Sequence, residues 1–172
     1  VGYQAGASGT MGAYTVGVGY NSLYNNTGNN NTGVGYNALF ANTSGTGNTA
    51  LGLQALDANT TASNNTAIGQ NALGSATTAE PNTAIGMDCM SACTTGGSNT
   101  CMGKDAAKNL TTGGSNTVIG VSAGLTITTG SSSILLGKEA NVSGSGNSEL
   151  VIGNAISGIG NNTGLIYPPG GG

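Results

Sequence analysis

The side chains best suited to acid–base catalysis in this chain are six carboxylates, because the sequence contains no histidine. General acid–base catalysis needs a titratable group that a partner holds in position. The carboxylates are scattered along the chain with no imidazole to pair with, at Asp57, Glu80, Asp88, Asp105, Glu139 and Glu149. The sequence therefore predicts no enzyme, no catalytic residue and no cofactor.

The other reactive side chains are three cysteines, Cys89, Cys93 and Cys101, which fall within thirteen residues. A CxxxC pair with one further cysteine and no histidine is a weak metal pattern, so we expect no metal site. Two interpretations remain open. Cys89 and Cys101 can replace alanine at positions that take small residues, or a disulfide involving Cys93 can form in an oxidising location.

The composition excludes several classes of protein. Of 172 residues 33 are glycine, only 5% are charged and the net charge is −3, so the chain lacks the clustered basic residues of a nucleic-acid surface. No apolar run approaches the roughly 18 residues of a membrane span, and we expect no membrane insertion. Because 37% of the residues are hydrophobic, the chain is not typical of disordered sequences either.

A phrase such as NTAIGQNAL, at residues 65–73, returns along the whole chain. Its glycine, here called the anchor glycine, recurs every 16 or 17 residues at Gly2, Gly19, Gly35, Gly52, Gly69, Gly86, Gly103, Gly120, Gly137 and Gly153. This period is too short for helical repeats, and the units are rich in β-branched residues. The prediction is an all-β fold, a parallel β-solenoid of about ten 17-residue coils, about 43 Å long at the strand spacing of ~4.8 Å.

The repeats predict where the array begins and ends. Val1 and Gly2 fall in the middle of the phrase, so we expect this chain to be a fragment of a longer one. We assign residues 1–157 to the solenoid. Residues 158–172, with Pro168 and Pro169 where a strand would need backbone donors, are assigned to a connector or tail.

Four columns of equivalent residues lie before the anchor glycines. The residue just before the anchor is always apolar, and we predict that this aliphatic column fills the coil interior. The threonine column, three residues before the anchor, should face the same way because side chains alternate along a strand. Four residues before it stands the asparagine column, whose amides can hydrogen-bond from coil to coil. The aliphatic column is Val1, Val18, Val34, Leu51, Ile68, Ile85, Met102, Ile119, Leu136 and Ile152.

The small-residue column, two residues before the anchor, should then point away from the interior. It is never polar, which is unusual for a surface facing solvent. We therefore predict that it forms the interface of a homotrimer, with a taper as the residues grow from glycine to leucine. The predicted interface residues are Ala50, Ala67, Ala84, Cys101, Val118, Leu135 and Val151.

With its anchor glycine and stacked aliphatic residues, the NTAIGxxAL phrase resembles the head repeats of trimeric autotransporter adhesins of the YadA type. It resembles still more closely the repeats of phage tail fibres and related surface proteins that carry a C-terminal endosialidase-type intramolecular chaperone. The resemblance covers residues 1–157, although the period here is longer than in typical adhesin heads. It implies a left-handed parallel β-roll, assembly of three chains, and a head that binds host surface molecules.

Aromatic residues supply the one candidate for a ligand site. Tyr3, Tyr20 and Tyr36 share the position just after the anchor, here called the corner column. Their rings could stack on sugars while neighbouring amides bond the hydroxyls; simple stacking of the rings on one another is the alternative. The amides of this predicted glycan site are Asn21, Asn37 and Gln54.

Together these features predict an extracellular structural protein, a trimeric fibre shaft or adhesin head that attaches to a host or cell surface, with a glycan or receptor as partner. An ice-binding solenoid is the first alternative, since low charge and threonine columns fit it. The expectation that one threonine column faces inward argues against it. A self-assembling extracellular filament is the second alternative.

Overall fold

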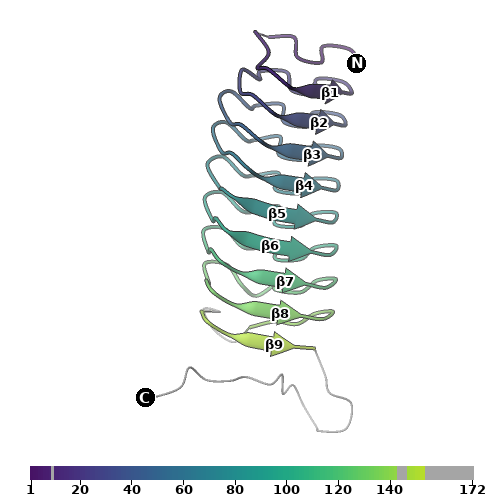
Figure 1. Cartoon of the computed structure of the whole chain (residues 1–172). Coiled ribbons are helices and arrows are strands. Elements are labelled where there is room, and N and C mark those ends of the chain that lie inside the picture. The colour runs from purple at the N-terminus through teal and green to yellow at the C-terminus, as the bar shows by residue number, and fades with distance from the viewer. Residues whose placement is uncertain (9, 143–146, 154–172) are drawn as a thin grey trace, which may run out of the picture.

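The computed structural model describes residues 1–8, 10–142 and 147–153. Within them the chain is a parallel β-solenoid whose strands lie one above the other along the long axis (Figure 1). Nine strands form one sheet in the order β1 to β9, and every neighbouring pair is parallel. The predicted all-β, parallel β-solenoid fold is confirmed.

Each strand is three or four residues long and ends just before an anchor glycine. Every residue pairs with its equivalent one repeat later, for example Thr66 with Thr83 and Ile68 with Ile85. The spacing of the phrase therefore sets the register of the whole sheet. The strands are β1 Val16–Val18, β2 Thr32–Val34, β3 Thr49–Leu51, β4 Thr66–Ile68, β5 Asn82–Ile85, β6 Asn99–Met102, β7 Thr117–Ile119, β8 Ile134–Leu136 and β9 Leu150–Ile152.

Backbone hydrogen bonds between coils continue beyond the strands. After each anchor glycine the chain turns, and its amides still reach the neighbouring coils: Asn37 N donates to Tyr20 O at 3.0 Å, and Leu39 N donates to Ala55 O at 3.0 Å. One coil is thus bonded to the next around much of its circumference. This satisfies backbone groups that the short strands alone would leave unpaired.

The predicted inner and outer faces of the strand are reversed. The small-residue column is buried inside the chain's own coil, with Ala50, Ala67 and Ala84 at 0% exposure. The aliphatic column instead faces outward, with Leu51 at 46% and Met102 at 45%. The prediction that the threonine column shares the face of the aliphatic column is right, but that face is the outer one.

From β1 to β5 the interior side of the strand must be small because the opposite wall of the coil is close. That wall carries the leucine column, four residues after each anchor from Gly19 to Gly120: Leu23, Leu39, Leu56, Leu73, Met90, Ala107 and Gly124. A Cβ placed on Gly33 would lie 3.1 Å from Leu23 Cγ, and one on Gly17 would lie 3.5 Å from Leu23 Cδ1. Each leucine therefore fills the space that two neighbouring strands leave empty.

The two facing columns change size in opposite directions along the axis. The small-residue column grows from Gly17 to Leu135, while the leucine column shrinks from Leu23 to Gly124. Toward the C-terminal end the strand carries the large side chain and the opposite wall the glycine. A Cβ on Gly124 would lie 3.0 Å from Val118 Cγ1. The change from glycine to leucine thus compensates for the smaller residues on the opposite wall and keeps the core filled. It does not indicate a taper in a trimer, which corrects that prediction.

The asparagine column is buried in the same core and bonds from coil to coil, as predicted. The Asn82 side-chain oxygen accepts the backbone N–H of Asn99 at 2.9 Å, and Asn82 Nδ2 donates to Gly96 O at 2.8 Å. The same two bonds recur at the column's other members, Asn31, Asn48, Asn65, Asn99 and Asn116. Each asparagine thus links a strand to the far corner of its coil.

The described residues contain nine strands, where about ten coils were predicted. Gly2 has the backbone of an anchor glycine, with φ +136°, but no strand precedes it. The predicted connector, residues 158–172, lies outside the described residues, as does the predicted end of the array at residue 157.

Candidate functional surface

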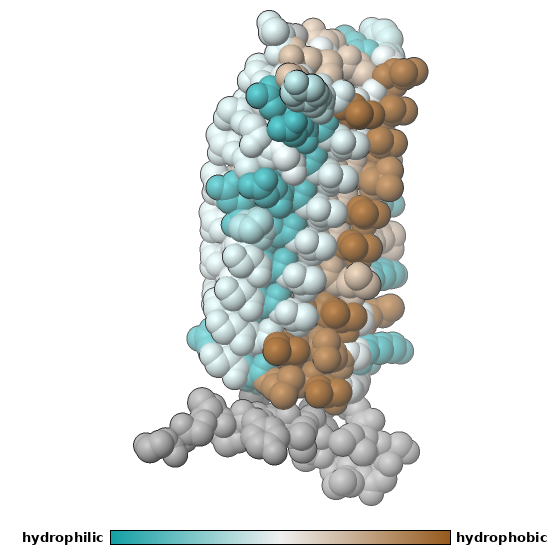
Figure 2. Space-filling view, in the orientation of Figure 1, coloured by the Kyte–Doolittle hydropathy of each residue, from teal (hydrophilic) through white to brown (hydrophobic). Residues whose placement is uncertain are grey.

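The aliphatic column makes a continuous apolar surface on the outside of the sheet. Figure 2 shows apolar side chains gathered in a band that runs along the long axis. Its exposed members include Val18 at 40%, Ile119 at 38% and Ile152 at 48%. No charged residue interrupts the column from β1 to β9. A strip this long, apolar and exposed is uncommon on a protein that functions as a monomer.

The corner column widens this apolar surface. It lies just beyond the anchor glycines and carries Tyr20, Tyr36, Leu53, Met87 and Val121, each exposed by at least 38%. Unlike the aliphatic column it also contains polar and charged residues: Gln70, Lys104 and Lys138. The aliphatic column thus forms an uncharged centre, and the corner column forms a border that mixes apolar, polar and charged residues. Protein–protein contacts have the same arrangement, with an apolar core and a polar rim.

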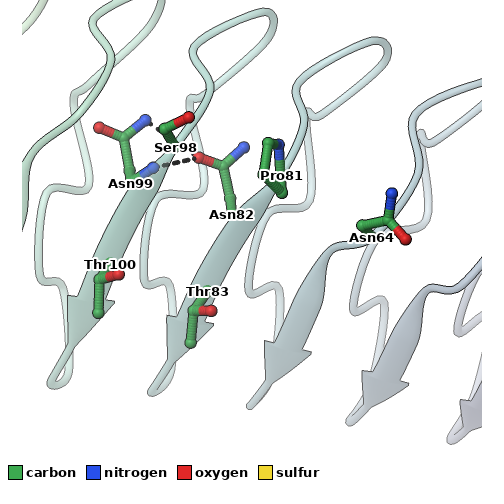
Figure 3. A pocket seen from close by; sticks show the side chains of 7 residues that line it. All are labelled: Asn64, Pro81, Asn82, Thr83, Ser98, Asn99 and Thr100. Carbon is green, nitrogen blue, oxygen red and sulfur yellow. Dashed lines mark hydrogen bonds between the residues drawn. The ribbon is translucent and has the colours of Figure 1, made fainter.

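On the other side of the aliphatic column stands the threonine column: Thr32, Thr49, Thr66, Thr83, Thr100 and Thr117. Thr83 and Thr100 project in the same direction from β5 and β6 (Figure 3). With Asn64, Pro81 and Ser98 they line a shallow hollow of about 190 Å³. None of the six hydroxyls is hydrogen-bonded to another residue of the described chain. They are free to bond water or a partner.

The second threonine column, eight residues after each anchor, differs in this respect. The Thr60 hydroxyl donates to Thr77 O at 3.2 Å, and the Thr111 hydroxyl donates to Thr128 O at 2.9 Å. These hydroxyls are already used to join one coil to the next. The regularly spaced hydroxyls that remain available to water or a partner are therefore those of the threonine column on the strands.

The predicted trimer-interface residues do not lie on any outer surface. Ala50, Ala67, Ala84, Cys101, Val118 and Leu135 are fully buried within the single chain, and Val151 is 6% exposed. They pack against the leucine column and cannot touch another copy. The prediction was wrong because it gave the larger apolar residue of every strand to the interior. Where the opposite wall carries leucine, the strand side has room only for glycine or alanine.

The predicted glycan site is assembled only in part. The tyrosine rings are exposed, but Tyr3 stacks on Tyr20 and Tyr20 on Tyr36, with centroids 5.3 Å apart in both pairs. Their faces are turned toward one another rather than toward a ligand. The side-chain oxygens of Asn21 and Asn37 are buried, so they cannot accept a bond from a sugar hydroxyl. The geometry favours the stacking alternative.

The third amide of that predicted site, Gln54, is also turned toward its own chain. Its Nε2 donates to an Asp57 carboxylate oxygen at 3.5 Å. Burial raises the pKa of Asp57, and this hydrogen bond opposes the rise only in part. The amide nitrogen of the half-buried Gln54 is thus engaged by a carboxylate of its own chain.

A small ion cluster occupies the corner near β5 and β6. Lys108 Nζ lies 3.0 Å from an Asp105 oxygen and 3.4 Å from an Asp88 oxygen. The Asn71 amide, at 2.8 Å, is the main cause of the lowered pKa of Asp88, and Lys108 adds to it. Asp105 in turn raises the pKa of Lys108. These groups are mutually satisfied, which fits a structural role.

The three cysteines are free thiols in the core. Burial raises the pKa of Cys93 to about 11, so this sulfur is not a reactive thiolate at neutral pH. Within the described ranges no group of three or more cysteine, histidine or acidic residues is placed to hold a metal ion.

The described part of the chain contains no helix long and apolar enough to cross a membrane. Its fold and repeats place the chain in the class of parallel β-solenoid repeat proteins. No protein-family model matches it, and neither the curated proteins nor the solved structures give a significant match.

Proposed function

We propose that this chain is a structural segment of an extracellular fibre, in which copies associate along the aliphatic column to form a homotrimer. The observation that carries the proposal is the exposure of this uncharged column along the whole sheet. Burial of apolar surface contributes roughly 25 cal/mol per Å². A column repeated from β1 to β9 offers each copy many equivalent contacts, so the complex is stabilised along its length.

A cyclic trimer places the same residues of each chain around one axis, with all chains parallel. The aliphatic column suits the centre of such a contact because it contains no charge. The corner column suits the border, since Lys104 and Lys138 can keep their ammonium groups in water there. The resemblance to tail-fibre and adhesin repeats supports the same assembly. Attachment to a host or cell-surface glycan or receptor is the further role that this resemblance suggests.

The test compares the wild type with a double substitution in the aliphatic column, Ile68→Glu with Ile85→Glu. We expect light scattering to give three times the chain mass of 16.5 kDa for the wild type and the single-chain mass for the variant. The reason is that buried, unpaired carboxylates are costly. Thr78→Glu with Thr95→Glu is the matched control, because both threonines are exposed after the second threonine column.

Circular dichroism should show the same β structure in all three proteins, since neither pair of positions belongs to the coil interior. A monomeric wild type would refute the proposal, as would an Ile68/Ile85 variant that remains trimeric.

Ice binding is a second candidate, and one observation favours it. The threonine column, which had been expected to face inward, faces outward with free hydroxyls beside an aliphatic column. This regular array is the surface such a function would use, but a trimer formed on the same face would cover it. Thermal hysteresis from a monomer would support ice binding. A trimer without hysteresis would support the fibre, and growth without a fixed mass would indicate the self-assembling filament.

A further inference from the structure

Cys89 and Cys101 face each other inside one coil. Cys89 lies in the turn after β5, and Cys101 lies in the small-residue column on β6. The Cys89 thiol is 3.4 Å from the carbonyl oxygen of Cys101. Both side chains are fully buried. The Cys89 sulfur therefore reaches across the narrow interior to the strand that carries Cys101.

The equivalent pair near the start of the solenoid shows how close these positions are. Ser22 and Gly33 occupy the same two columns, and the Ser22 hydroxyl makes the matching bond, donating to Gly33 O at 2.7 Å. A Cβ on Gly33 would lie 2.8 Å from Ser22 Oγ. Adding the length of the Ser22 Cβ–Oγ bond to this distance places the Cβ atoms of the two positions at most about 4.2 Å apart. Disulfides need a Cβ–Cβ distance of roughly 3.5–4.5 Å.

We propose that Cys89 and Cys101 form a disulfide across the coil when the protein is made in an oxidising environment. The oxidant is a small exchangeable disulfide, such as oxidised glutathione. The two thiols together lose two protons and two electrons and form one S–S bond, while the oxidant is reduced to two thiols. The bond closes a loop from the end of β5 to β6 and ties two adjacent strands together. This inference does not depend on the proposed fibre function.

Cys93 is not a partner in this bond. Its thiol donates to Gly96 O at 3.5 Å, so the sulfur is directed toward the far corner of the coil. The proposal therefore differs from the prediction of a disulfide involving Cys93.

The bond must form before the coil closes. Contact with the Cys89 thiol, followed by burial, raises the pKa of Cys101 well above its ordinary value. Exchange requires a thiolate and access to the oxidant, and the folded core supplies neither. Oxidation during folding meets both conditions.

Alanine occupies the equivalent positions in neighbouring coils, which makes alanine variants suitable controls. The Cys89 position is alanine in the neighbouring coils, at Ala72 and Ala106, and the Cys101 position is alanine at Ala84. Cys89→Ala and Cys101→Ala therefore place at each position a residue that an adjacent coil already carries at the equivalent position. We expect both variants to fold.

The experiment makes the full chain in an oxidising and in a reducing compartment, then alkylates it under denaturing conditions and measures its mass. We expect one alkylated cysteine, Cys93, in oxidised protein and three in reduced protein. Peptide mapping should show Cys89 joined to Cys101. Cys101→Ala should show two alkylated cysteines under both conditions, and Cys93→Ala none when oxidised.

The melting temperature gives a second readout. Closing a short loop should raise that of the oxidised wild type on the order of 5 °C above the reduced form. Cys101→Ala should show no such difference. Three alkylated cysteines in protein from the oxidising compartment would overturn the proposal, and so would a bond that includes Cys93 or joins two chains.

Discussion

The anchor glycine closes each strand in a backbone conformation that other residues avoid. In Gly69 φ is +132°, and a Cβ there would lie 2.5 Å from the carbonyl oxygen of Gly86, the next anchor. Both the torsion and the lack of space require glycine. Each anchor from Gly2 to Gly137 lies against the following one in the same way, which explains why the glycine recurs in every one of these coils.

We expect Gly69→Ala to lower the free energy of unfolding by on the order of 3 kcal/mol, since it adds both strain and a clash with backbone. Urea denaturation measures the loss. Gly17→Ala is the control. Its Cβ would meet ordinary contacts at 3.5 Å or more, and the same column carries alanine in later coils, so we expect little change. Equal stability of the two variants would contradict this role of the anchor.

Leucine residues also adopt left-handed torsions, in this case because of the core. In Leu56 and Leu73 φ is +52° and +51°, and both side chains are fully buried. The torsion costs about 1–2 kcal/mol, whereas burying a leucine contributes about 1.5–3 kcal/mol. Where the facing strand already fills the space, Gly124 takes this position with φ +70°. Packing thus decides which residue occupies the turn.

At the scale of one coil, the size of the small-residue column and the size of the leucine column are coupled. Large residues stand on the wall opposite β1 to β4, and large residues stand on the strand from β7 onward. In either arrangement one wall carries the large side chains and the other carries the small ones, so the interior is filled. The coil therefore tolerates a change on one side only when the other side compensates, which distinguishes this core from one whose positions vary independently.

This coupling predicts a double-mutant result. We expect Leu73→Ala to cost about 2–5 kcal/mol through a cavity, and Ala84→Val to cost about 1–3 kcal/mol through overpacking. The combined variant should be more stable than the sum of the two predicts, by at least 0.5 kcal/mol. As a control, Leu39→Ala combined with Ala84→Val joins distant coils, and its effects should add. Additive effects in the adjacent pair would show that the two columns are independent.

On the scale of the whole molecule, each coil contacts mainly the coils before and after it. Among the nine described strands, pairings run only between neighbours, from β1 with β2 to β8 with β9. Stability in such a fold is close to a sum over coils and their interfaces. The chain should therefore accept the loss of a coil if the columns stay in register.

Deletion of residues 66–82 tests this expectation. It removes one complete repeat and joins Asn65 directly to Thr83, which restores the NTAIG phrase. We expect a folded solenoid shorter by one strand spacing, ~4.8 Å, with a slightly lower melting temperature. Circular dichroism and small-angle scattering measure both properties.

Deletion of residues 66–73 is the control, because it shifts every later column by eight positions and should prevent folding beyond the junction. Unfolding of the complete-repeat deletion would contradict the additive description.

Much of the fold could be predicted from spacing alone. A glycine every 16 or 17 residues, with an apolar residue before it, indicates stacked parallel strands in register whatever the shape of the coil. The coil-to-coil bonding of the asparagine column was predictable for the same reason, since equivalent residues must lie above one another. The absence of histidine made acid–base catalysis an unpromising interpretation without any coordinates.

The sequence also contained a sign of the correct inner face that the prediction did not use. The asparagine column and the small-residue column are two residues apart on the strand, so their side chains point to the same face. An unbroken series of asparagines bonding to one another favours burial, because a buried amide must find hydrogen-bond partners. That reasoning would have placed alanine inside and isoleucine outside.

The sequence by itself determined the period, the strand positions, the register and the pairing of columns, because these follow from repetition along one axis. Only the tertiary structure decided which columns face inward, because this depends on the width of the coil. Leu23 crosses the interior to the strand opposite, so that strand can carry only glycine or alanine there. The larger aliphatic residues are thereby placed on the outer face, and the surface available to a partner is theirs.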